Sequence, residues 1–197
     1  MKQDQPSSPV ALGQMHHLKE LFAMLNAGRH INRLSEPALW ADLEREATQY
    51  QRLFNALGYE LRIDGRGYAW FQTSEASGTV SKATRQLALI FMLIFEMQAD
   101  AGRHLGRFDE WRIDRALLTG LLDKNRALLD AEGLGEIEPM QQLLETAVRY
   151  GFADAANGAW RLLPAVYRYL DRFEELAGNA DLAGDAIELA IAEREAS

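Results

Sequence analysis

Apolar residues near the start of the chain recur at the period of an α-helix. One face of a helix predicted over residues 14–27 has apolar residues at i, i+3, i+4 and i+7: Leu18, Leu21, Phe22 and Leu25. Gly28 is the expected stop, because glycine tolerates the left-handed conformation that ends many helices. The short segment from Arg29 to Leu34 is then predicted to be extended.

A second helical pattern follows this extended segment. Ser35 is expected to be its N-cap and Pro37 lies in its first turn, which are positions that these residue types favour. The helix is predicted to run to about residue 57. Its apolar stripe consists of Leu39, Leu43, Ala47, Tyr50, Phe54 and Leu57.

After Gly58 the apolar period shortens from about 3.6 residues to 2, the period of a β-strand. Residues 59–63 alternate apolar with charged side chains, a Gly-rich turn occupies 64–67, and a second alternating stretch covers 68–72. Two short strands around such a turn predict a β-hairpin. Residues 73–79 are rich in Ser, Thr and Gly without any period, and are predicted to link two domains.

The second part of the chain repeats this order of elements. Three helices are predicted, over residues 80–100, 110–129 and 139–150. Asp109 is expected to cap the second of these, and Leu128 to face inward from it. Asn157-Gly158 predicts a second hairpin, because both positions of a two-residue turn require a positive φ. Pro164 is expected to begin a further helix.

Helices followed by a hairpin, twice over, indicate an α+β protein that is predominantly helical. The order helix–helix–helix–hairpin is that of a winged helix, so we predict tandem winged-helix domains, each with a β-hairpin wing. The predicted divisions are a disordered leader over 1–12, a first winged-helix domain over 13–75, a second over 76–176 and an acidic C-terminal tail over 177–197.

Composition narrows the functional classes. The 197 residues are 48% hydrophobic, which is enough for packed cores, and the absence of cysteine excludes disulfides and fits a reducing cytoplasm. The net charge of −8 argues against strong autonomous DNA binding. Half of that charge lies in residues 176–197. The most apolar run, Leu87–Phe95, is far shorter than the ~20 residues of a membrane span, and no membrane association is expected.

The chain carries no recognisable catalytic constellation. It has no Gly-x-x-x-x-Gly-Lys-Ser/Thr phosphate loop, and its four histidines lack the i, i+4 spacing that holds a metal on a helix. The glycines of the 64–67 turn lie between two predicted strands, whereas a dinucleotide fingerprint opens a helix. We therefore predict a protein that is not an enzyme and has no cofactor or metal site.

Two segments have a more distinctive sequence. The first is Gly-Arg-His-Ile at 28–31, and the second is Arg-Tyr-Gly-Phe at 149–152, which leads through Asn-Gly into Trp-Arg-Leu-Leu-Pro at 160–164. With the hairpin segment 67–71 they resemble the MukE/MksE family of KITE-type winged-helix subunits, and MksE most closely in length. The resemblance covers roughly residues 15–175.

The resemblance implies an accessory subunit of a bacterial condensin-like complex. Such subunits form homodimers and bind a kleisin subunit, through which they join an SMC-type ATPase. In some systems a nuclease-like fourth subunit is present. The implied location is cytoplasmic and nucleoid-associated, and the implied roles are chromosome organisation or plasmid defence, with duplex DNA held non-specifically within the complex.

The predicted third helix of the second domain, 139–150, is a poor candidate for reading bases, because its charged side chains are one Glu, Glu145, and one Arg, Arg149, rather than a basic face. Contact with the DNA backbone remains a hypothesis for five basic residues: Lys124, Arg126, Arg149, Arg161 and Arg168. Ordinary surface ion pairing is an equally good interpretation of these residues.

Large aromatic residues are the candidates for a partner surface, because exposed aromatics often mark protein interfaces. The candidates are Trp40, Tyr59, Tyr68, Trp70 and Phe71. The alternative is that they close the cores of their own domains. Two other functions stay open at this point: a winged-helix transcriptional regulator, which would bind a specific DNA site, and an enzyme of unknown class, which would need a polar pocket.

Overall fold

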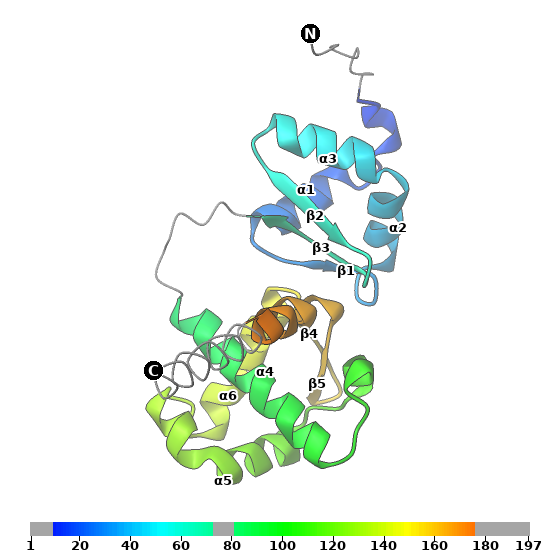
Figure 1. The fold of residues 1–197 in the computed structure, drawn as a ribbon. Coiled ribbons are helices and arrows are strands. Elements are labelled where there is room, and N and C mark those ends of the chain that lie inside the picture. Colours follow the sequence, from blue (N-terminus) through cyan, green and yellow to red (C-terminus); the bar gives the residue numbers. More distant parts are fainter. Residues whose placement is uncertain (1–9, 73–80, 176–197) are drawn as a thin grey trace, which may run out of the picture. The chain divides into compact units, whose positions relative to one another are not determined.

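The computed structural model describes residues 10–72 and 81–175 of the chain (Figure 1). Most of the predicted leader, the predicted linker and the predicted acidic tail lie outside the described residues. The described residues up to Ala165 form one compact unit, and a second unit begins at Val166 with a helix that covers residues 167–175. The domain boundaries predicted at 75/76 and 176/177 stay predictions.

The first half of unit 1, residues 10–72, places three helices against a small antiparallel sheet (Figure 1). Its elements are the 3-10 turn η1 (Leu12–Gln14), α1 (Leu18–Asn26), β1 (Ile31–Asn32), α2 (Pro37–Arg45), α3 (Ala47–Ala56), β2 (Glu60–Asp64) and β3 (Tyr68–Gln72). The strand order is β1-β3-β2. The hairpin prediction is confirmed, and the predicted extended segment supplies β1, which pairs Ile31 with Ala69.

Three predictions for the second helical pattern are wrong. The pattern forms two helices, because Glu46 leaves helical geometry with φ −109° and ψ 24°. The N-cap position of α2 is occupied by Glu36, and the Ser35 hydroxyl instead donates to the Glu36 carboxylate at 2.5 Å. Leu57 lies beyond the end of α3 and is 57% exposed, since the backbone turns toward the hairpin there.

A buried carboxylate ties the helices of the first half together. Asp42 on α2 accepts hydrogen bonds from the Tyr50 hydroxyl at 2.5 Å and the His17 amide at 2.9 Å, and it pairs with Arg45. Burial alone raises the pKa of Asp42, but the hydrogen bonds from Tyr50 and His17 and the charge of Arg45 outweigh it, so the pKa is lowered overall. Burial, together with Asp42, raises the pKa of Tyr50.

The second half of unit 1, residues 81–165, has the same order of elements. It contains α4 (Lys82–Asp100), the 3-10 turn η2 (Leu105–Glu110), α5 (Arg115–Ala131), α6 (Ile137–Arg149), β4 (Ala153–Ala156) and β5 (Ala159–Leu162), and a further 3-10 turn, η3, spans Pro164–Val166. β4 and β5 form the predicted hairpin, with φ of 53° at Asn157 and 69° at Gly158. Ile113 bridges to Trp160 and so occupies the place that β1 has in the first half.

Two predictions for α5 are wrong. Asp109 lies within η2, and the cap of α5 is Asp114, whose carboxylate accepts from the Leu117 amide at 3.1 Å. Leu128 is 45% exposed, because Asn125 departs from helical geometry (φ −124°, ψ 27°) and rotates the inward stripe onto Leu129.

The described residues are thus mostly helical with small antiparallel sheets, which confirms the predicted α+β class. None of the described helices is both long enough and apolar enough to cross a bilayer.

Candidate partner-binding and nucleic-acid surfaces

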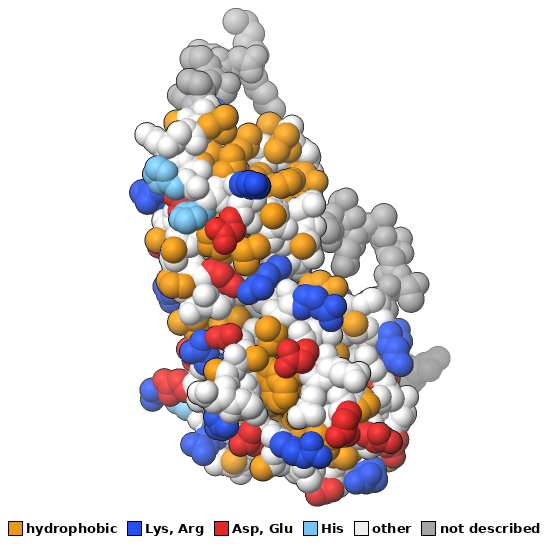
Figure 2. Space-filling view, turned by 180° about the vertical axis from the view of Figure 1, so that it is seen from behind, with side chains coloured by type: hydrophobic (Ala, Val, Ile, Leu, Met, Phe, Trp, Pro, Cys, Tyr) orange, Lys and Arg blue, Asp and Glu red, His pale blue; other side chains and the backbone are white. Residues whose placement is uncertain are grey.

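An apolar groove of about 580 Å³ opens on the first half between η1, α1 and α3. Leu12 and Leu57 stand on its walls, each 57% exposed, and Phe22 and Phe54 lie deeper. Lys19 and His16 are the polar residues that line it. In Figure 2, hydrophobic side chains, drawn in orange, gather on the surface of the N-terminal half. A contiguous apolar groove with exposed leucines on its walls is a candidate binding surface for another polypeptide.

Two of the predicted partner-facing aromatics support this groove from behind. Tyr59 and Phe71 stack on each other with ring centroids 4.8 Å apart. Tyr59 also meets Phe22 edge-on at 5.4 Å, and Phe71 meets Phe54 edge-on at 5.0 Å. Both residues are half-buried, so their main contribution is to hold the groove-lining rings in place.

The other three predicted aromatics lie elsewhere. Trp40 is 4% exposed in the core of the first half, and Tyr68 is 1% exposed. Trp40 and Tyr68 are therefore too deeply buried to offer a partner the exposed aromatic surface that the sequence predicted. Trp70 is half-buried and stacks on Tyr68 at 5.4 Å.

The tip of the first hairpin is held by charge. Arg66 donates to the Asp64 carboxylate at 2.8 Å and the Tyr68 hydroxyl donates to it at 3.0 Å. The Arg66 hydrogen bond lowers the pKa of Asp64 to about 2; burial opposes this shift and Tyr68 adds to it.

The basic residues proposed to touch DNA belong to four elements: α5, α6, β5 and the helix of the second unit. Lys124 on α5 lies 3.0 Å from Glu96 and 2.6 Å from Asp100, both on α4. Hydrogen bonds to these two carboxylates raise the pKa of Lys124, and the bond to Asp100 has the larger effect. Arg126 lies 3.6 Å from Asp123 on the same helix. Their positive charge is therefore largely offset where it stands.

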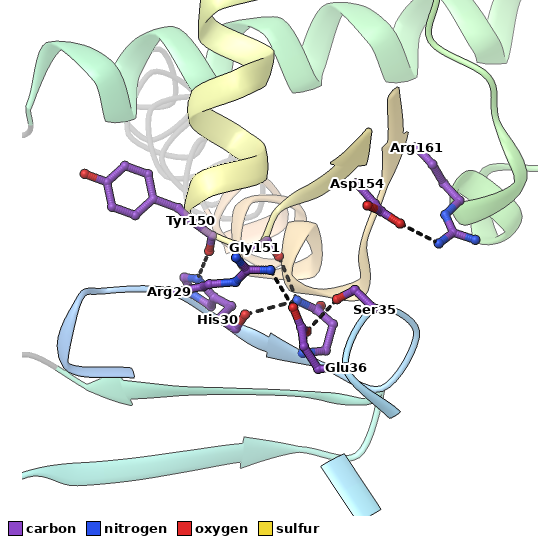
Figure 3. A network of polar contacts seen from close by, with 9 residues as sticks. Arg29, His30, Ser35, Glu36, Tyr150, Gly151, Asp154 and Arg161 are labelled. Atoms are coloured by element: carbon purple, nitrogen blue, oxygen red, sulfur yellow. Dashed lines mark hydrogen bonds and ion pairs between the residues drawn. The ribbon is translucent and has the colours of Figure 1, made fainter. Parts of the chain in front are cut away.

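The remaining three basic residues come from separate elements. Arg161 on β5 pairs across the hairpin with Asp154 at 3.1 Å (Figure 3). Arg149 at the end of α6 contacts the Thr146 hydroxyl at 2.9 Å and the Tyr150 ring. Arg168 is exposed in the helix of the second unit. Three of the five candidates, Lys124, Arg126 and Arg161, thus lie beside carboxylates that offset their charge toward a phosphate backbone.

A polar cluster missing from the sequence predictions connects the two halves of unit 1 (Figure 3). Asn32 is fully buried and its amide donates to the Gly151 carbonyl at 2.8 Å. Glu36 accepts from Arg29 at 2.5 Å and from the Asn32 backbone amide at 3.0 Å. The sequence offers little signal for this cluster, because Asn32 is one of four polar residues in the six-residue extended segment 29–34.

Candidate metal ligands are not gathered in the same way. Within residues 10–72 and 81–175, no three His, Asp or Glu side chains are arranged so that they could hold a metal ion.

Comparison with known proteins identifies the family. No curated protein matches the chain significantly. The model of the family described as condensin complex protein MksE matches residues 16–174, which covers the first half of unit 1 from residue 16 on, the second half, and all but the last described residue of the 167–175 helix. The chain therefore belongs to the MksE family of condensin complex proteins.

Proposed function

We propose that this chain is a non-catalytic accessory subunit of a bacterial condensin-like complex and that it is built of two tandem winged-helix domains. The family match over residues 16–174 carries the proposal. It is supported by the repeated order of helix, short strand or bridge, two helices and hairpin in residues 10–72 and 81–165.

The proposed partners are a second copy of the chain, a kleisin subunit and, through the kleisin, an SMC-type ATPase, with a nuclease-like fourth subunit in some systems. We assign the kleisin segment to the groove that Leu12 and Leu57 flank. An extended or helical segment with apolar side chains would cover both leucines, and the aromatic backing of Tyr59 and Phe71 gives the groove a rigid floor.

The proposed role in DNA binding is secondary and non-specific. Three of the five basic candidates, Lys124, Arg126 and Arg161, already lie beside carboxylates. Duplex DNA would therefore be held by the assembled complex near the nucleoid, in chromosome organisation or plasmid defence, and not by this subunit alone.

Affinity purification of the tagged chain from its native cells tests the proposal. A kleisin and a long coiled-coil ATPase should be recovered at near-stoichiometric levels, and light scattering of the purified chain should give twice 22.2 kDa. Recovery of the chain alone, or with one specific promoter DNA, would contradict the condensin proposal and favour a transcriptional regulator.

The groove assignment has its own variant test. Leu12→Asp with Leu57→Asp should abolish kleisin recovery while the dimer persists, because carboxylates on the groove walls would have to be desolvated by an apolar partner. Met92→Asp is the matched control, since Met92 is 44% exposed on α4 and outside the groove. Loss of the dimer with the kleisin still bound would assign the groove to self-association instead.

A further inference from the structure

The two segments that resemble the family most closely lie 120 residues apart in sequence, yet they contact each other. The backbone amide of His30 and its ring Nδ1 both lie 2.9 Å from the Tyr150 carbonyl oxygen. A carbonyl oxygen only accepts hydrogen bonds, so Nδ1 must carry a proton and donate. The His30 ring also packs against Phe152, with centroids 4.4 Å apart.

The contact satisfies backbone groups that the end of α6 leaves without partners. The last carbonyl groups of a helix receive no hydrogen bond from within the helix, so their donors must come from elsewhere. For Tyr150 and Gly151, which follow α6 directly, the donors come from the first half: His30 for the first carbonyl and the Asn32 amide for the second, at 2.8 Å.

Asn32 makes a second connection with its other amide atom. Its Oδ1 accepts from the backbone amide of Ala165 at 3.1 Å, at the start of η3. One buried side chain therefore serves an acceptor and a donor of the second half at once, because a carboxamide donates from its nitrogen and accepts at its oxygen. An aspartate of the same shape would place an anion against the Gly151 carbonyl and lose the donor.

Gly151 leaves no room for another residue at this contact. Its φ is +76°, and a Cβ built on it would collide with the backbone oxygen of His30. Glycine is therefore required both by the backbone conformation and by the close approach of the first half.

We infer that these residues, His30 and Asn32 with Tyr150, Gly151 and Ala165, form a clasp that holds the two halves of unit 1 as one rigid body in solution. The segments that mark the family thus act by positioning the two halves relative to each other. The inference does not depend on which partners the chain binds.

A spin-label distance measurement on the full chain tests the clasp. The protein has no cysteine, so Thr48→Cys on α3 and Ala127→Cys on α5, both exposed, provide one label in each half. Diluted with an excess of unlabelled chain, so that a dimer carries labels on one copy only, the labelled chain should give a single narrow distance peak. Asn32→Asp and Gly151→Ala should each lose the narrow peak in favour of a broad distribution, while circular dichroism keeps the helical signal.

Matched substitutions separate the clasp from general effects. Gly58→Ala creates the same strain as Gly151→Ala, since Gly58 has φ +85°, but it has open space around the added carbon. Gln142→Glu repeats the amide-to-acid change at an exposed site of α6. Both controls should keep the narrow peak.

Two results would overturn the inference. One is a broad or multiple distance distribution for the labelled chain without further substitution. This measurement tests the clasp even if a substituted variant fails to fold. The other is a narrow peak that persists unchanged in folded Asn32→Asp and Gly151→Ala proteins.

Discussion

The two halves of unit 1 share one order of elements and are stabilised in different ways. In the first half, residues 10–72, three polar residues are buried: His30, Asn32 and Asp42. In the described part of the second half, residues 81–165, Gln98 is the one buried polar residue. The first half also has a three-stranded sheet, whereas the second has a hairpin with a single bridge to Ile113.

This difference indicates a division of roles. Apolar burial is non-directional and tolerates several arrangements, whereas buried hydrogen bonds are satisfied in one arrangement only. The helices of the second half can rely on the apolar side chains of α4, α5 and α6. The short helices of the first half carry fewer buried apolar side chains, and Asp42 fixes how α2 meets α3 and the start of α1.

The largest expected effect is in the apolar half. Phe91 is fully buried on α4, so Phe91→Ala should lower the free energy of unfolding by about 3–5 kcal/mol. Denaturant titration followed by tryptophan fluorescence measures this. Met92→Ala, next to it and 44% exposed, should change the free energy by less than about 0.5 kcal/mol. Equal effects of the two substitutions would contradict the packing described for α4.

A smaller loss is expected in the polar half. Asp42→Asn keeps the shape but removes the charge, which weakens the bonds from Tyr50, His17 and Arg45. It should cost about 2–3 kcal/mol. The matched control is Asp123→Asn, which breaks an exposed pair with Arg126 and should cost at most about 0.5 kcal/mol. If Asp42→Asn were as mild as its control, the buried network would not organise the first half.

The smallest effect appears only in acid. Asp64 has its pKa lowered to about 2 from an ordinary value of 3.8, so its contribution to stability is present above pH 4 and is lost as the pH falls through 2. The loss amounts to about 2 kcal/mol for a shift of this size. Unfolding curves between pH 7 and pH 2 should show that Asp64→Asn flattens this decline.

The second hairpin supplies a control for the acid experiment. Asp154→Asn removes a carboxylate that pairs with Arg161 across β4 and β5, as Asp64→Asn removes one beside Arg66. If the free energy of unfolding of Asp64→Asn fell with pH as steeply as that of the wild type, Asp64 would not be the source of the acid loss.

Much of the local structure could be predicted from the sequence. The two hairpins follow from a change of apolar period and from turn residues such as Asn157-Gly158, and these act over a few residues. The wrong predictions also concern local detail: Ser35 as a cap, an unbroken helix through Glu46, and Leu128 facing inward. Each failed because two local solutions compete closely and distant packing chooses between them.

The candidate surfaces were less predictable. The types of residue were visible in the sequence, but it does not show that Trp40 and Tyr68 are buried or that the α4 carboxylates neutralise Lys124.

The sequence by itself determined the two hairpins, the fold class and the family, because each depends on periodicity and short motifs read along the chain. Only the tertiary structure decided that Asn32 meets Gly151 and that Leu12 and Leu57 flank one groove. Burial, charge pairing and the meeting of distant segments depend on contacts between residues far apart in sequence, and such contacts leave no period in the chain that could be read in advance.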